Sequence, residues 1–303
     1  MENETTFVNA TAILDEHNRK AKRKNIAYKT VLYTIMVILA IFLLFPYFYM
    51  ICQSLMNVEE VSTLKFFPSK PMFKNYVTIF KTGGYGTGLI YTLIIIAFNL
   101  VVVPIASSII AYSFAKLRWV GRKVMFALML GTMMLPAAVT QLPLYVMYAK
   151  FGWLDTIAPF TVPNIFGGGA VYIFLIRQFM MGIPNALEDA AKIDGANTFT
   201  RYFKIVLPLC VPVLIYVMVQ VFIAYWGDYY GPLVFLRSYK NDGAVKTIAL
   251  VLYGFTTDPS NRGSQGNEVV FAGAVFMSVI PTILFAIFQK QLIEGVTMSG
   301  IKG

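Results

Sequence analysis

Long apolar stretches alternate with short polar segments along most of this 303-residue chain. Six of the stretches are long enough for a helix to cross a bilayer, which takes about 20 residues. The pattern predicts an all-α polytopic membrane protein with six transmembrane helices. The predicted spans cover about 30–54, 89–115, 124–148, 157–180, 205–234 and 268–289. Segments 55–88 and 235–267, rich in Gly, Pro, Asn and Ser, are expected to be ordinary connectors.

Prolines inside the predicted spans indicate kinked helices, because proline removes a backbone hydrogen bond. They are Pro46, Pro104, Pro136, Pro143, Pro212 and Pro281. The fourth span is the weakest, since it begins with two prolines and contains the glycines 167–169 and Arg177. Kinked helices suit a bundle with a pathway through it, although they also occur in purely structural helices.

Composition supports the membrane assignment. Hydrophobic residues make up 57% of the chain and charged residues 13%, against about 25% charged in soluble domains. The net charge is +10, but the basic residues cluster between apolar spans, so nucleic acid is not an expected partner. Most of them fall on the side of the N-terminus, which places both termini in the cytoplasm. The expected organisation is a basic N-terminal segment 1–29, a transmembrane domain 30–292 with a cytoplasmic loop 182–204, and a cytoplasmic tail 293–303.

The chain offers little for catalysis or metal binding. It has two cysteines and one histidine, and no G-x-x-x-x-G-K-[ST] loop for ATP. An intramembrane enzyme needs a Ser/His pair, paired Asp or a zinc motif, and none is evident. We therefore expect no catalytic residue, no metal site and no bound cofactor in this chain, which is not expected to be an enzyme.

The charged stretch 182–204 contrasts with the apolar sequence on both sides. Pro184 can start a helix, and Gly195 can end it with a positive φ. Glu188 and Lys192 stand four residues apart in the favourable order, so we expect them to pair. The sequence predicts a short, capped helix between the fourth and fifth spans.

One face of this helix is small, because Leu187, Ala190 and Ala191 share it. Asn197 or Thr198 can cap a second helix that leads into the fifth span. A helix lying on the membrane surface would favour basic residues and bulky apolar anchors. The acids and alanines found here instead favour docking of another protein.

The segment "DAAKIDGANTFTRYFKIVLP" resembles the E-A-A-x-x-x-G-x9-I-x-L-P signature of permease subunits in bacterial ABC importers. Asp replaces the usual Glu at position 189, with Glu188 beside it. Similar stretches elsewhere are "FFPSKPMFKNY", "AYSFAKLRW", "MMLPAAVTQLPLYVMYAKFGWLDT", "FLIRQFM" and "EGVTMSGIKG". Together they resemble the second permease of carbohydrate importers of the maltose/multiple-sugar type.

The resemblance implies a type I ABC importer permease fold in a bacterial cytoplasmic membrane. It implies a homologous second permease, a cytoplasmic ATPase dimer that binds ATP and Mg²⁺, an extracytoplasmic solute-binding protein and a sugar substrate. The loop 182–204 would be a coupling helix that sits in a groove of the ATPase. The residues expected to take part are Glu188, Asp189, Ala190, Ala191, Asp194, Gly195, Ile205, Leu207 and Pro208.

Polar and aromatic residues within or near the spans are candidates for the substrate path. They are Asn99, Gln141, Asn164, Gln220, Trp226, Asp228 and Tyr229. Hydrogen bonds between helices or an interfacial aromatic belt explain the same residues, so both interpretations stay open. The spans lack a basic cluster, which favours an uncharged oligosaccharide. The alternatives are an ion-coupled secondary transporter without an ATPase, and an ABC importer of a solute other than sugar.

Overall fold

A computed structural model describes residues 2–63, 65–238, 241, 243–263 and 265–300. For residues 2–21, 23, 137, 262 and 293–300 it describes the backbone alone. Every regular element within these ranges is a helix, which confirms the all-α prediction. Part of the expected tail 293–303, residues 301–303, lies outside the described residues.

The helices differ widely in length, from single turns in connecting segments to the 53 residues of the first helix. In chain order they are α1 (Glu2–Ser54), α2 (Val58–Ser62), α3 (Lys74–Lys81), α4 (Tyr85–Lys116), α5 (Arg122–Thr132), α6 (Ala137–Lys150), α7 (Ala158–Ile165), α8 (Ala170–Met181), α9 (Asn185–Ile193), α10 (Thr198–Arg201), the π-helix η1 (Tyr202–Val206), α11 (Leu207–Leu209), α12 (Val211–Trp226), α13 (Tyr230–Phe235), α14 (Ile248–Thr257), the 3₁₀ helix η2 (Pro259–Arg262) and α15 (Asn267–Gly300).

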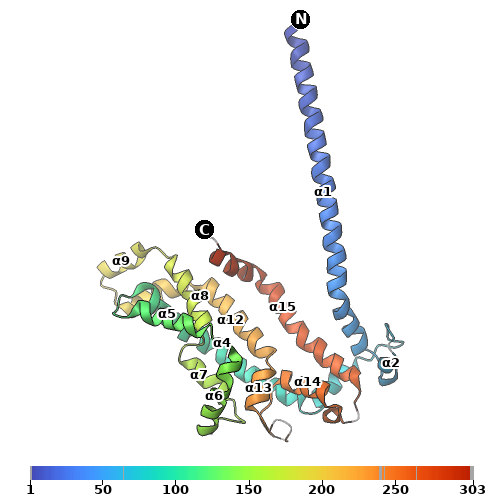
Figure 1. The fold of residues 1–303 in the computed structure, drawn as a ribbon, viewed down its shortest axis with the longest axis vertical. Helices are drawn as coiled ribbons and strands as arrows, with labels where there is room; N and C mark the ends of the chain where they lie inside the picture. The colour runs from blue at the N-terminus through green and yellow to red at the C-terminus, as the bar shows by residue number, and fades with distance from the viewer. Residues whose placement is uncertain (1, 64, 239–240, 242, 264, 301–303) are drawn as a thin grey trace.

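Helix α4 is the centre of the bundle. It packs against α7, α8, α12 and α14, while α15 packs against α1, α3 and α12. The largest apolar core lies between α4, α8, η1 and α12, and includes the fully buried Ala111, Ile176 and Val217. Figure 1 shows α1 as a long rod whose first half extends well beyond the other helices.

Four helical segments are long and apolar enough to cross a membrane: Lys24–Ser54, Tyr85–Lys116, Ala158–Met181 and Asn267–Leu292. They correspond to the predicted first, second, fourth and sixth spans. A fifth is obtained if a bent pair of helices is counted as one span. The structure thus supports four or five spans by this criterion, and not the six that the pattern predicts.

The predicted third span, 124–148, is not one helix. It is divided into α5 and α6, with the break at residues 133–136. Pro136 precedes α6 in an extended conformation, with φ −61° and ψ 133°. Proline has no N–H to donate and disfavours helical geometry in the residue before it, so the helix ends there.

The predicted fifth span, 205–234, also differs. Thr198–Leu209 and Val211–Trp226 form a pair bent by 74°. Two prolines flank the bend, at positions 208 and 212, and each removes a backbone donor. Helix α12 then ends at Trp226, so that α13 is a separate short helix.

The segment 235–267 is more than an ordinary connector, because it contains the buried apolar helix α14. Thr247 caps this helix by accepting a hydrogen bond from the Leu250 N–H, and the Thr92 hydroxyl accepts one from the Ile248 N–H at 2.9 Å. Leu250 and Phe255 are almost fully buried. Helix α14 packs on α4 and extends the core.

The helix bundle has two ends, and different segments of the chain lie at each. Figure 1 places α9, the start of α1 and the end of α15 toward one side, which we call the α9 end. Helices α6, α13 and α14 lie toward the opposite end. The charged loop thus lies on the same side as both chain ends.

Candidate functional site

The charged loop has the local structure that its sequence predicts. Helix α9 follows Pro184 and ends at Ile193, two residues before Gly195, which has φ +82°. The Gly195 N–H donates to the Lys192 carbonyl, and the Ala196 N–H donates to the Ala191 carbonyl at 2.9 Å. These two bonds are the Schellman pattern of helix ends, which requires the positive φ that glycine supplies.

A second cap starts the next helix. The Asn197 side chain accepts a hydrogen bond from the Thr200 N–H at 2.8 Å. Of the two expected capping residues, Asn197 is therefore the one used, and Thr198 begins α10. The two caps define the turn between α9 and α10. They therefore fix the orientation of the end of α9 relative to the start of α10.

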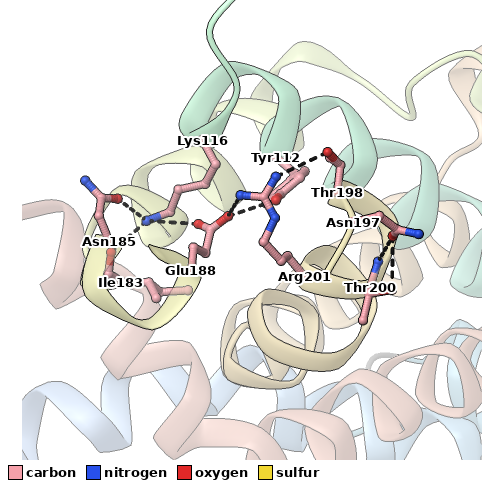
Figure 2. A network of polar contacts seen from close by, with 9 residues as sticks. All are labelled: Tyr112, Lys116, Ile183, Asn185, Glu188, Asn197, Thr198, Thr200 and Arg201. Atoms are coloured by element: carbon pink, nitrogen blue, oxygen red, sulfur yellow. Dashed lines mark hydrogen bonds and ion pairs between the residues drawn. The ribbon is translucent and has the colours of Figure 1, made fainter. Parts of the chain in front are cut away.

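Glu188 on α9 points into the protein, as Figure 2 shows. Its side chain is 8% exposed. The Tyr112 hydroxyl on α4 donates to Oε2 at 2.8 Å, Lys116 Nζ lies 3.6 Å from Oε1, and Arg201 Nη1 lies 3.9 Å from Oε2. One buried carboxylate thus connects α9 to both α4 and α10.

Lys116 also binds two residues outside α4 besides Glu188. Its ammonium donates to the Ile183 carbonyl at 2.7 Å and to the Asn185 side-chain oxygen at 2.9 Å. It is the last residue of α4, where a cation is favoured by the helix dipole. Because Ile183 follows α8 and Asn185 begins α9, one ammonium group holds the ends of α4 and α8 beside the start of α9 (Figure 2).

The network continues toward the fifth span. Arg201 Nη2 donates to the Thr198 hydroxyl at 3.2 Å, within α10. The ring of Tyr202 in η1 lies 5.2 Å from that of Tyr112, and the Tyr202 hydroxyl is 2.7 Å from that of Ser108. Helix α4 is therefore linked to α9, α10 and η1 at the α9 end.

The structure corrects two expectations for Glu188. Its carboxylate pairs with Lys116 and Arg201, and not with Lys192, among the residues described. The Glu188 side chain also turns away from the surface, although Glu188 was among the residues expected to take part in docking to the ATPase. The reason is that Tyr112 and Lys116 on α4 and Arg201 on α10 lie on this side of α9 and give the buried carboxylate one hydrogen-bond donor and two cations.

The other residues expected to take part in coupling are exposed or half-buried. Asp189, Ala190, Asp194 and Gly195 are exposed, and Ala191 is half-buried. Further along, Ile205 and Leu207 are half-buried and Pro208 is exposed. Two large apolar side chains lie beside them: Ile193 is 87% exposed and Phe199 is 74% exposed. The α9 end thus presents small, acidic and apolar groups next to one another.

Most candidates for the substrate path are engaged within the protein. Asn99 is fully buried, and its amide donates to the Ile95 and Phe160 carbonyls at 2.9 Å each. Its oxygen accepts from Asn164, whose amide also lies 2.5 Å from the Tyr225 hydroxyl. These two asparagines bind α4, α7 and α12 together, as interhelical hydrogen bonds do.

The residues near the end of α12 are also engaged. Trp226 is 2% exposed and donates to the Met277 carbonyl at 2.7 Å, so it connects α12 to α15. Asp228 accepts from the Gly231 N–H, Tyr229 stacks on Tyr253, and Gln141 accepts from the Tyr230 hydroxyl. Gln220 differs, because it lines an open cleft.

Sequence reasoning did not identify Tyr112, Lys116 and Arg201 as parts of the site. The first two lie in "AYSFAKLRW", one of the stretches that carries the family resemblance. That stretch therefore indicated that these residues matter to the family, but it did not indicate that they contact Glu188. The contact between Tyr112 and Glu188 spans 76 positions, which only the packing of α4 against α9 reveals.

Several known proteins are similar to this chain over most of its length. The family model for the binding-protein-dependent transport system inner membrane component matches residues 104–297. The arabinooligosaccharides transport system permease protein AraQ of Halalkalibacterium halodurans is 33% identical over 247 residues, covering 80% of this chain and 83% of its own length. The melibiose/raffinose/stachyose import permease protein MelC of Bacillus subtilis is 29% identical, covering 85% and 91%.

One solved structure has a similar fold. The chain is similar to a subunit of a bacterial ABC transporter involved in the import of the acidic polysaccharide alginate, with a TM-score of 0.74, 25% identity, and coverage of 88% of this chain and 97% of that one. The chain belongs to the family of binding-protein-dependent transport system inner membrane components, which are permease subunits of ABC importers.

Proposed function

We propose that this chain is the membrane permease subunit of an ATP-driven importer of an uncharged oligosaccharide. The similar permeases AraQ and MelC are named for arabino-oligosaccharides and for melibiose, raffinose and stachyose. The observation that carries the proposal is the α9 helix, fixed to the bundle by Glu188 while Asp189, Ala190 and Gly195 remain exposed.

The exposed face of α9 is proposed to dock into a groove of a cytoplasmic ATPase, which binds ATP and Mg²⁺. Small residues such as Ala190 allow the backbone of a partner to approach closely. Ile193 and Phe199 add apolar surface, which strengthens association when it is removed from water. Asp189 and Asp194 can pair with basic groups of the partner.

The same helix can transmit movement of the ATPase to the membrane domain. The Schellman turn and the Asn197 cap fix α9 relative to α10, and α10 leads through η1 into α12. Glu188 and Lys116 fix α9 to the end of α4. A displacement of α9 therefore acts on α4 and α12 together, and ATP binding can shift the balance between two orientations of the pathway.

The remaining partners follow from the family. A homologous second permease would form the other half of the pathway, and an extracytoplasmic solute-binding protein would deliver the sugar. We place the α9 end in the cytoplasm of a bacterial cell, with both termini on that side. The location of α9 and both chain ends on one side of the bundle supports this orientation, as does the distribution of lysine and arginine.

The test is purification of the chain from its native membrane, followed by reconstitution in vesicles with the subunits that co-purify. We expect an ATP-hydrolysing subunit to co-purify and oligosaccharide uptake to require ATP and the solute-binding protein. Ala190→Trp should abolish both co-purification and uptake, because a bulky side chain prevents close docking. Uptake that needs an ion gradient and no nucleotide would identify a secondary transporter instead.

A further inference from the structure

A cleft of about 450 Å³ opens between α5, α8 and α12. Its lining comes from the break between α5 and α6, from the start of α8 and from the middle of α12. The lining residues are Thr132, Met133, Gly169, Ala170, Val171, Tyr172, Leu175, Tyr216 and Gln220. Its volume lies within the range of about 300–1,000 Å³ that is typical of ligand sites.

The cleft lies near the middle of the membrane-crossing helices. Gly169 and Ala170 are close to the midpoint of the Ala158–Met181 span, and Gln220 is well inside α12. Substrate sites of membrane transporters commonly occur at this depth, where helices are discontinuous. Interrupted backbone at membrane depth is tolerated where it lines a cavity.

Two tyrosines and one glutamine line the cleft: Tyr172, Tyr216 and Gln220. The hydroxyls of Tyr172 and Tyr216 and the amide of Gln220 make no hydrogen bond within the part of the chain that the structure describes. All three are half-buried. Polar groups at hydrocarbon depth are costly unless they are hydrogen-bonded, so these groups require an occupant that can bond to them.

The chemistry of the lining restricts that occupant. None of the nine lining residues is charged, which disfavours an ionic ligand. Two phenol rings offer flat apolar faces, while their hydroxyls and the Gln220 amide offer both donors and acceptors. An uncharged sugar has the complementary pattern, with C–H faces and several hydroxyl groups.

The shape of the cleft is held by the helix break beside it. Gly168 has φ +67°, and a Cβ there would lie 2.7 Å from Val103 Cγ1 on α4. The Ser107 hydroxyl on α4 donates to the Gly167 carbonyl at 2.8 Å. The break between α7 and α8 is therefore fixed against the central helix, which gives Tyr172 a defined position.

We propose that Tyr172, Tyr216 and Gln220 form a sugar-binding site through which this subunit contacts the transported oligosaccharide directly. The proposal rests on the function proposed above, and adds to it the place and the side chains that bind the sugar. It also separates Gln220 from Asn99 and Asn164, whose amides are occupied by bonds between helices.

The test compares variants in the complete reconstituted transporter. Gln220→Leu and the double variant Tyr172→Phe/Tyr216→Phe remove the polar groups with little change in shape. Gln178→Leu is the matched control, because Gln178 is exposed on α8 outside the cleft. Maltotriose and raffinose serve as probes, together with whichever oligosaccharide the solute-binding protein retains. Uptake rate and ATP hydrolysis are measured at saturating loaded binding protein.

We expect the cleft variants to lower the uptake rate about tenfold, since each leaves sugar hydroxyls unbonded in a buried site. Subunit assembly and ATP hydrolysis stimulated by the loaded binding protein should stay near wild type, as should every property of Gln178→Leu. Unchanged uptake in both cleft variants would overturn the proposed site. Loss of the second permease from the cleft variants would overturn it as well, because the polar groups would then belong to a subunit interface. Nucleotide-independent uptake by the wild type would instead overturn the proposed function, whatever the variants do.

Discussion

Glu188→Gln tests whether the buried carboxylate holds α9 in place. Glutamine keeps the size of the side chain and can still accept the hydrogen bond from Tyr112. It loses the charge that faces Lys116 at 3.6 Å and Arg201 at 3.9 Å. The Lys116 side chain is 4% exposed, so its ammonium would remain buried beside neutral oxygens alone.

The magnitude follows from this geometry. Removing one partner of a buried ion pair costs about 3–5 kcal/mol, because the remaining charge is left uncompensated. The lower limit applies here, since Lys116 keeps two oxygen acceptors and the Arg201 side chain is 17% exposed. A cost of about 3 kcal/mol corresponds to a factor of about 100 in the equilibrium between seated and detached α9.

The assay is hydrogen exchange of the α9 amides in the assembled transporter in lipid nanodiscs. We expect the amides of residues 185–193 to exchange up to about 100-fold faster in Glu188→Gln, and the sugar imported per ATP to fall. Glu59→Gln is the control, because Glu59 is an exposed acid on α2. Adding Lys116→Met to Glu188→Gln should recover part of the lost protection, since it removes the uncompensated cation.

Equal exchange of these amides in Glu188→Gln, Glu59→Gln and wild type would falsify the view that this carboxylate positions α9.

Three further predictions concern the loop and the helix break. Gly195→Val should uncouple ATP hydrolysis from uptake, because a β-branched residue at φ +82° is strained and the Schellman turn would shift; uptake at full rate with normal assembly would contradict this. Asn197→Ala should destabilise α10 by about 1 kcal/mol through loss of its cap, which is measured as faster amide hydrogen exchange at residues 198–201. Thr200→Ala keeps the Asn197 side-chain oxygen that accepts the capping hydrogen bond, so it should change the exchange rate little. Gly168→Ala should lower the melting temperature of the purified complex, because its Cβ would lie 2.7 Å from Val103 Cγ1. Gly263→Ala is the control, since Gly263 has open space around it. Equal melting temperatures of the two variants would show that the contact with Val103 relaxes freely.

Hydropathy alone predicted the four long apolar segments that can cross a membrane, because a long apolar run satisfies its backbone in lipid only as a helix. It did not predict which prolines interrupt those helices. Pro143 lies inside α6, whereas Pro136 separates α5 from α6. Proline lacks an N–H donor at both positions, so the presence of a proline does not by itself show where a helix ends.

The buried helix α14 shows the same limit. Its ten residues are too few to cross a bilayer, and the surrounding segment is polar enough to resemble a connector. What places it in the core is the contact of its apolar face with α4. A short apolar run can lie at a surface or in a core, and its length does not distinguish the two.

Within the loop, a few consecutive residues were enough to predict the local structure: a helix after Pro184, a turn at Gly195 and a cap near Asn197. These features depend on backbone dihedrals and neighbouring hydrogen bonds, which a few consecutive residues specify. The packing of distant elements determines that Glu188 faces inward while its neighbour Asp189 stays exposed. The reason is that Tyr112 and Lys116 come from a helix far away in the chain, and a carboxylate leaves water only where packing brings such partners to it.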